Sequence, residues 1–169
     1  ITFVATANVA LYVGAHPVFA DVAEDTVNLS PLAVHEALKT HVNVKAVIPV
    51  HFAGLPCDMV NIKELADQAG AIVIEDGAHA LGASYPDGTR VGACTHSLMT
   101  IFSFHPVKAV AAGEGGIITT NDESVFRKLI RLRSHGVNKL DDEFLQPAQA
   151  ADAEGANPWY YEMQGLGFH

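Results

Sequence analysis

Four groups of residues lie where predicted strands or helices begin or end, and their side chains could carry out chemistry. One group is Glu75-Asp76-Gly77-Ala78-His79, which directly follows an apolar run over residues 71–74. A carboxylate after a buried strand, followed by small residues, leaves room for a ligand to approach the backbone. The alternative interpretation of Asp76 is an aspartate that caps a following helix.

The second group ends in a lysine with apolar neighbours. It comprises residues 102–108, Phe-Ser-Phe-His-Pro-Val-Lys, follows another predicted strand, and leads into Gly113-Glu114-Gly115-Gly116. A single lysine is usually an exposed surface charge. Val107 and the Ala-Val-Ala-Ala run over 109–112 favour a different interpretation, because an apolar setting disfavours the ammonium form of Lys108. The free amine is the nucleophile that Schiff-base chemistry requires.

Two further residues, Phe3 and His51, are candidates for ligand contact. Phe3 precedes a predicted helix and could present its ring to a flat ligand, with packing in the core as the alternative. His51 follows a predicted strand and could contact a ligand, with a hydrogen-bonded structural histidine as the alternative.

Strand and helix patterns alternate along the chain, and this alternation predicts how these residues are positioned. Helices are predicted over 6–13, 31–38, 58–69 and 125–132, strands over 17–21, 44–50, 71–74, 97–102 and 116–120, and a loop over 146–157. The first helix would be capped by Thr6, and Ser30-Pro31 would open the second. All-apolar strands need cover on both faces, so the prediction is a three-layer α/β domain with its ligands at the carboxyl ends of the strands.

Composition excludes several classes of protein. The chain of 169 residues has a formal charge of −9, and its densest basic stretch, Arg127–Arg133, is interpreted as a solvated helix face, so a nucleic-acid surface is not expected. The sequence has no apolar run long enough to span a bilayer, and no membrane partner is expected. Cys57 and Cys94 match no metal or disulfide spacing, which favours no metal site and a reducing, cytoplasmic location.

Taken in order, the motifs of the chain resemble those of a known enzyme family. The motifs are TFVATAN, YVGAHPVFADV, VIPVHFAG, IEDGAHALGA, FSFHPVK, GEGGIITTND, LRSHGVNK and WYYEMQGLGF. They resemble the DegT-type sugar-nucleotide aminotransferases, which are fold-type I enzymes that use pyridoxal 5′-phosphate (PLP). The resemblance covers essentially the whole chain, and the spacing from Asp76 to Lys108 also fits it. It implies the three-layer α/β large domain of the aspartate aminotransferase-like PLP enzymes.

The resemblance also assigns roles to individual residues. Lys108 would hold the cofactor covalently and act as the catalytic base, and Asp76 would pair with the pyridine nitrogen. His79 would lie close to the cofactor, Ser103 would bind its phosphate, and Phe3 would stack on its ring. His51, at the end of a predicted strand, and His105, in the segment before Lys108, are further candidates for contact with the substrate.

The reaction implied is the transfer of an amino group from glutamate to a keto group of a nucleotide-linked sugar. The SFHPVK and WYYEMQ segments are most similar to enzymes of the type of UDP-4-amino-4,6-dideoxy-N-acetyl-β-L-altrosamine transaminase, which act at C4 of a UDP-linked deoxysugar. One alternative is a PLP-dependent sugar dehydratase or deoxygenase. In the dehydratase branch a histidine replaces the lysine, so Lys108 argues against it. The other alternative is a non-catalytic regulatory protein on the same scaffold, against which the intact set of Asp76, Ser103 and Lys108 argues.

The resemblance further predicts that residues 1–169 are the central part of the PLP-binding large domain of a longer protein. An upstream phosphate-binding turn and a small C-terminal domain would lie outside the chain. The family has an asparagine that reaches the partner subunit's cofactor where this chain has His169. The whole protein is therefore expected to be a homodimer, and the 169-residue piece alone is expected to be inactive.

Overall fold

The computed structural model describes residues 3–138, 144–152 and 155–168. The chain divides into two compact units, residues 1–121 and 122–169, and each is described by itself. The first unit contains a four-stranded sheet, and all of the candidate site residues belong to it.

The sheet places three parallel strands beside one antiparallel strand. Its order is β1 (Ala46–Val47), β2 (Ile72–Asp76), β3 (Met99–Ser103) and β4 (Gly116–Thr119). β1, β2 and β3 run parallel, and β4 runs antiparallel to β3. In register, Asp76 lies opposite Ile101, and Ser103 lies opposite Gly116. The carboxyl ends of β1, β2 and β3 therefore lie at one edge of the sheet, as the alternating pattern predicted.

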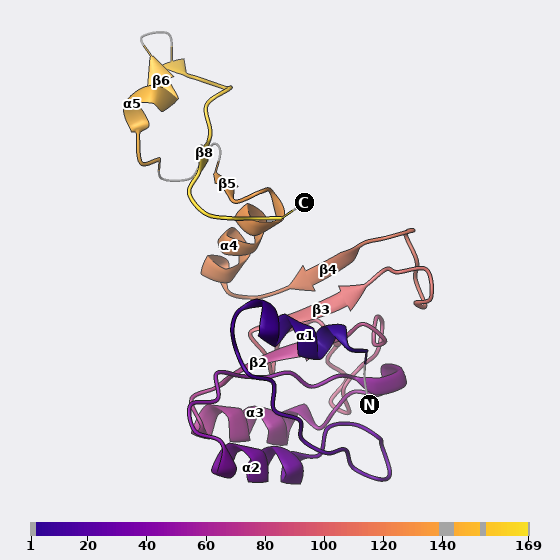
Figure 1. Ribbon diagram of the computed structural model, residues 1–169. Helices are drawn as coiled ribbons and strands as arrows, with labels where there is room; N and C mark the ends of the chain where they lie inside the picture. The colour runs from indigo at the N-terminus through magenta and orange to yellow at the C-terminus, as the bar shows by residue number, and fades with distance from the viewer. Residues whose placement is uncertain (1–2, 139–143, 153–154, 169) are drawn as a thin grey trace. The chain divides into compact units, whose positions relative to one another are not determined.

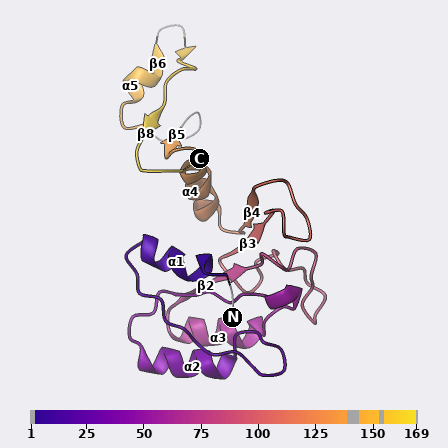
Figure 2. The ribbon, with the colours of Figure 1, turned by 45° about the vertical axis from the view of Figure 1, so that its right-hand side comes forward.

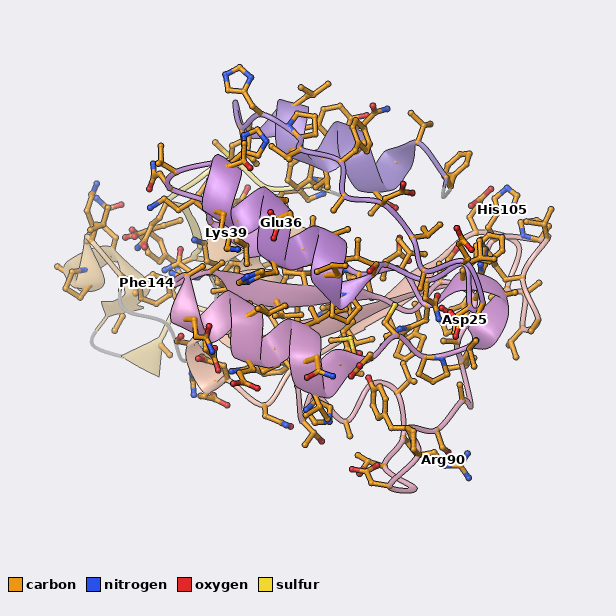
Figure 3. The ribbon with its side chains drawn as sticks, turned by 90° about the horizontal axis from the view of Figure 1, so that it is seen from below. Asp25, Glu36, Lys39, Arg90, His105 and Phe144 are labelled. Atoms are coloured by element: carbon orange, nitrogen blue, oxygen red, sulfur yellow. The ribbon has the colours of Figure 1, made fainter. Side chains whose placement is uncertain are left out.

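Helices lie on both faces of this sheet (Figures 1 and 2). α1 (Ala5–Tyr12) lies on one side, and α2 (Pro31–Thr40) and α3 (Met59–Gln68) lie side by side on the other (Figure 3). The caps of α2 and α3 follow from the sequence. Ser30 Oγ accepts from the Ala33 N–H at 3.5 Å, with a proline at the next position, and Asp58 accepts from the Asn61 N–H at 3.3 Å. The predicted three-layer α/β arrangement is confirmed.

The hydrophobic core lies between the sheet and α3. Side chains along a strand alternate between its two faces, so Val73 of β2 and Phe102 of β3 point to the α3 side. They pack there with Ile62 and Ala66, which are fully buried on one face of α3. Apolar residues at this helical spacing bury one stripe of α3 and leave its other faces to solvent.

The opposite face of the sheet is only partly covered within the chain. Ile101 and Ile118 lie opposite each other on β3 and β4, and their side chains are 38% and 44% exposed. α1 lies over this face but has no buried residue of its own. The sequence predicted cover on both faces, and within the chain the α3 face is well covered over β2 and β3 but not over β4, where Ile117 is 47% exposed.

Two predicted elements differ from the structure. The strand predicted over residues 17–21 joins no sheet, and the nearest pairing is an isolated bridge between Val22 and Leu29. The predicted loop over 146–157 contains α5 (Pro147–Ala150) and the short strands β6 (Ala151–Asp152) and β7 (Gly155–Ala156).

The predicted cap of the first helix also differs from the structure, since Thr6 does not cap α1, whose N-cap is Val4. The remaining predicted helices and strands are confirmed within a few residues, except that regular pairing in the run over 44–50 is confined to Ala46–Val47.

The second unit begins with α4 (Glu123–Arg133), which is capped by Asp122. β5 (Val137–Asn138) pairs antiparallel with β8 (Glu162–Met163). Desolvation raises the pKa of Glu162, but hydrogen bonds outweigh it and lower the pKa to about 2. The donors are the Gln164 side chain, the Leu145 N–H at 2.7 Å, the Tyr160 hydroxyl and the Gln146 N–H at 2.8 Å. Among the described residues no helix is long and apolar enough to cross a membrane.

The core predicts a sharp contrast between two positions of α3. Ile62→Ala should lower the free energy of unfolding by about 2–5 kcal/mol, because it removes fully buried methyl groups and leaves a cavity. Val60→Ala, on the exposed side of the same helix, should change it by less than about 0.5 kcal/mol. Chemical denaturation of the full-length protein measures both variants. Equal effects would show that α3 is not packed on the sheet through Ile62.

Candidate active site

The candidate site lies at the carboxyl edge of the parallel strands. Asp76 ends β2 and Ser103 ends β3. Asp76 pairs with Ile101, and Ser103 follows Ile101 by two positions, so both polar side chains project from the same face of the sheet. This is the α1 face, opposite the core. The strands therefore place a carboxylate and a hydroxyl on the same face, at the carboxyl edge of the sheet where the sequence predicted that a ligand would bind.

Asp76 is held by two hydrogen bonds. Its Oδ2 accepts from the Thr6 hydroxyl of α1 at 2.6 Å, and its Oδ1 accepts from the Ala78 N–H at 3.1 Å. The second bond closes a turn around Gly77, and no helix starts after Asp76. The helix-capping alternative for Asp76 is therefore wrong. The carboxylate remains half-buried at the end of the strand, where it can accept a further donor.

Gly77 lies in tight contact with β3, where a side chain would be crowded. A Cβ at this position would lie 3.1 Å from the carbonyl oxygen of Ile101 and 3.0 Å from the Phe102 ring. The Gly77 N–H also donates to that carbonyl oxygen at 2.8 Å. The glycine after Asp76 thus lets the chain leave β2 in close contact with β3.

Lys108 belongs to the loop over residues 104–115 that connects β3 to β4. The loop is closed at its base by the Phe104 N–H, which donates to the Gly115 carbonyl oxygen at 2.8 Å. The Lys108 N–H donates to the His105 carbonyl oxygen at 2.9 Å, which fixes the turn leading into the lysine. This arrangement places the lysine a short stretch of chain beyond Ser103.

The apolar setting expected for Lys108 is not formed within the chain. Its side chain is half-buried, and its neighbours Val107 and Val110 are 78% and 53% exposed. Apolar residues adjacent in sequence therefore do not surround the amine with apolar contacts here. The role of Lys108 as the nucleophile stays a proposal based on its position and its motif.

His105 lies on the same loop and is bound within it. Its N–H donates to Ser103 Oγ at 3.3 Å, and its Nδ1 accepts from the Val107 N–H at 3.3 Å. Its Nε2 lies 4.0 Å from a carboxylate oxygen of Glu114. The side chain is exposed, so His105 can still contact a substrate and it remains a candidate.

Phe3 and His79 occupy exposed positions near this edge of the sheet. Phe3 is 73% exposed, so the alternative that it packs in the core is wrong. Its carbonyl oxygen accepts from the Thr6 N–H at 3.2 Å, which joins it to α1. His79 lies in the turn after β2, and its ring meets the edge of the Phe52 ring with centroids 6.2 Å apart. Both side chains are available to a ligand in the chain as described.

His51 does not share this availability. Its side chain has no exposed surface, its Nε2 lies 2.7 Å from Glu75 Oε2, and its Nδ1 accepts from the Cys57 N–H at 3.1 Å. Both ring nitrogens are therefore engaged inside the protein. The structure favours the hydrogen-bonded structural histidine over the contact with the substrate that the position of His51 after a strand suggested.

Glu75 is the centre of a buried polar network that the sequence did not reveal. It points to the core side of β2, has no exposed surface, and accepts from the Tyr85 and Ser97 hydroxyls as well as from His51. Thr100 of β3 donates to its Oε1 at 3.1 Å. A glutamate within an otherwise apolar strand was the one signal of such a network in the sequence.

The protonation states in this network follow from its hydrogen bonds. Because His51 Nδ1 accepts from a backbone N–H, its proton is on Nε2 and is donated to an ionised Glu75. Burial raises the pKa of Glu75, but the hydrogen bonds from His51, Ser97 and Tyr85 outweigh it and lower the pKa below its ordinary value. Burial, followed by the bond to Glu75, raises the pKa of Tyr85, so its phenol stays a donor.

The residues at this edge fit the cofactor that the resemblance implies. A carboxylate suits a protonated ring nitrogen, a hydroxyl suits a phosphate, and an exposed aromatic ring suits a flat heterocycle. Asp76, Ser103 and Phe3 supply these groups, and Lys108 supplies the amine. No group of three metal-ligating side chains occurs among the described residues.

Comparison with known proteins gives consistent matches. Residues 1–164 match the model of the DegT/DnrJ/EryC1/StrS aminotransferase family. Over 169 residues the chain is 38% identical to the spore coat polysaccharide biosynthesis protein SpsC of Bacillus subtilis, covering 99% of this chain and 40% of that protein.

Comparison with solved structures also finds aminotransferases. The structure of PseC from Helicobacter pylori, an aminotransferase involved in the biosynthesis of pseudaminic acid, is similar with a TM-score of 0.79 and 31% identity, over 99% of this chain and 39% of that one. DesI, solved in the presence of its TDP-sugar product, is similar with a TM-score of 0.72 and 34% identity, over 92% of this chain and 35% of the DesI chain. The chain thus spans about two fifths of the length of these relatives.

The buried network predicts a pH dependence of stability. Because folding lowers the pKa of Glu75, its contribution to stability is present above its ordinary pKa of 4.5 and is lost as the pH falls through the folded value. Glu75→Gln should therefore cost about 1–3 kcal/mol at neutral pH and flatten the acid limb of the stability curve. Denaturation of the full-length protein across pH 3–8 measures this.

The exposed Glu24 provides the matched control for this prediction. Glu24→Gln removes the same charge from the surface and should leave the curve nearly unchanged. If Glu75→Gln behaved like Glu24→Gln at neutral pH, the proposed network around Glu75 would be wrong.

Proposed function

Because the chain belongs to the DegT/DnrJ/EryC1/StrS aminotransferase family, we propose that the whole protein transfers an amino group from glutamate to a nucleotide-linked deoxysugar. The position aminated is proposed to be the C4 keto group, and the nucleotide to be UDP. The similarity to an aminotransferase of pseudaminic acid biosynthesis supports this class of substrate. The observation that carries the proposal is the placement of Asp76 and Ser103 on one face of the sheet edge, with Lys108 on the loop beyond.

The cofactor proposed for this edge is PLP, which when bound accepts electrons from the substrate carbon and so makes its proton removable. The carboxylate of Asp76 would hold the ring nitrogen protonated. The hydroxyl of Ser103 would donate to the phosphate, and Phe3 would lie against the ring face. His79, exposed in the turn after Asp76, is the proposed neighbour of the ring on the β2 side.

Lys108 would serve both as the covalent anchor and as the general base and acid. In that role its amine would have to reach both the substrate carbon that loses the proton and the cofactor carbon that receives it. The loop over 104–115 fixes the backbone of Lys108, and its long side chain retains the reach that such a transfer needs. Cys57 is no competing nucleophile, because burial raises the pKa of its thiol to about 12.

Residues 1–169 are proposed to be the central part of the cofactor-binding large domain of a longer, cytoplasmic protein. The whole protein is proposed to act as a homodimer, because enzymes that this chain resembles build their site at a dimer interface. The exposed Ile101 and Ile118 on the α1 face are consistent with further cover from outside the chain. His105 is proposed as a contact for the sugar substrate.

A substrate panel tests the proposed function. The full-length protein, supplied with PLP and glutamate, should aminate a UDP-linked 4-keto-6-deoxy N-acetylhexosamine. A TDP-linked 4-keto sugar is the comparison, because DesI was solved with a TDP-sugar product. Faster turnover of the TDP substrate would overturn the nucleotide assignment, and turnover of neither would overturn the amino transfer itself.

Lys108→Ala should abolish amino transfer while leaving pyridoxamine phosphate binding in place. The substitution removes the amine but no residue proposed to bind the ring or the phosphate. Turnover with glutamate and equilibrium binding of pyridoxamine phosphate are measured on the same preparation. Lys45→Ala, at an exposed position before β1, is the control and should retain full turnover. Normal turnover of Lys108→Ala would remove Lys108 from the mechanism.

Asp76→Asn should lower turnover at least a hundredfold but stability by about 1 kcal/mol or less. An amide keeps the shape and one acceptor for Thr6 or Ala78, but it cannot stabilise a protonated ring nitrogen. Turnover and the denaturation midpoint are compared in the full-length protein. A large loss of stability with little kinetic effect would mean that Asp76 is a structural residue.

A further inference from the structure

Thr6 forms a side-chain bond between two distant parts of the sequence. It lies in the first turn of α1, where its hydroxyl donates to Asp76 Oδ2 at 2.6 Å. The sequence suggested that Thr6 caps the helix, but the N-cap is Val4 and no side chain caps it. The hydroxyl is therefore engaged with the site carboxylate instead of the helix terminus.

The position of α1 depends little on apolar packing. None of its residues is buried within the described chain, and Val9 and Leu11 are 45% and 56% exposed. The bond from Thr6 to Asp76 joins the start of α1 to the end of β2. Thr6 also donates its N–H to the Phe3 carbonyl oxygen at 3.2 Å. One residue thus touches both Phe3 and Asp76.

We propose that Thr6 is a positioning residue that orients the Asp76 carboxylate toward the ring nitrogen of the cofactor. This inference rests on the proposed function, in which Asp76 pairs with that nitrogen. Thr6 at Oδ2 and the Ala78 N–H at Oδ1 bind the two carboxylate oxygens from different directions and so fix the plane of the carboxylate. Each oxygen has a second acceptor site, so the carboxylate can still receive the ring N–H.

The chemistry of this position calls for a hydroxyl. Thr6→Val keeps the branched shape and the N–H that binds Phe3 but removes the donor to Asp76. The carboxylate can then rotate, and its interaction with the ring N–H weakens. Thr6→Ser keeps the donor and should restore the orientation. Thr40→Val is the matched control, because the Thr40 hydroxyl donates only to the Glu36 carbonyl oxygen within α2.

The test compares two ligands that differ at one atom. Pyridoxamine phosphate has the ring nitrogen, and its 1-deaza analogue has a C–H group in that place. The dissociation constants of both are measured by equilibrium binding to the full-length apoprotein and to each variant. Wild-type protein should prefer pyridoxamine phosphate at least tenfold. Thr6→Val should reduce this preference about tenfold by weakening pyridoxamine phosphate alone, as expected for a charge-assisted hydrogen bond held in poor geometry. Thr6→Ser and Thr40→Val should retain it.

The outcomes distinguish the proposed role of Asp76 from the proposed role of Thr6. No preference in the wild-type protein would overturn the proposed role of Asp76. A wild-type preference that Thr6→Val leaves intact would overturn the role of Thr6 alone. Equal weakening of both ligands by Thr6→Val would show a general structural role and also overturn the inference. If Thr6→Val does not fold, Thr6→Ala gives the same comparison, because the preference is measured within one protein.

Discussion

The hydrogen bonds to the buried carboxylate of Glu75 are the interactions on which the arrangement of the strands in the first unit depends. Burying an ion costs free energy unless donors replace water, and here His51, Tyr85, Ser97 and Thr100 supply them. These donors come from the segment after β1, the loops between β2 and β3, and β3 itself. A single side chain therefore fixes the end of β2 relative to its neighbours on both sides.

The alternation of side chains along β2 connects the buried Glu75 network to the candidate site. Glu75 and Asp76 are consecutive, so they project from opposite faces of β2. Glu75 enters the core side, where it is fully satisfied, and Asp76 emerges on the α1 side, where it meets Thr6. The rigidity of the first residue determines where the second one is presented. Preorganisation of this kind is what a carboxylate needs if it is to meet a ligand at a defined angle.

Local chemistry made much of this predictable from the sequence. Ser30 and Asp58 cap helices because their side chains satisfy free N–H groups, and apolar runs located β2 and β3 with Asp76 and Ser103 at their ends. The predictions that failed concern features that depend on residues distant in the sequence. The apolar run over 17–21 has the composition of a strand but no neighbour to pair with. Three of the partners of Glu75, His51, Tyr85 and Ser97, lie outside the regular strands and helices, where no sequence period places them. The apolar neighbours of Lys108 in the sequence gave no information on their exposure.

The connection between β3 and β4 has a consequence for the order of folding. β3 and β4 are antiparallel neighbours joined by one loop, whereas β1, β2 and β3 pair in parallel only after longer segments of chain have crossed between them. Closing a short loop costs less entropy, so we expect the β3–β4 hairpin to form before the parallel pairs. Lys108 would then be presented on a formed turn while Asp76 is still unplaced. The site would then be complete only after the slower step in which β2 pairs with β3.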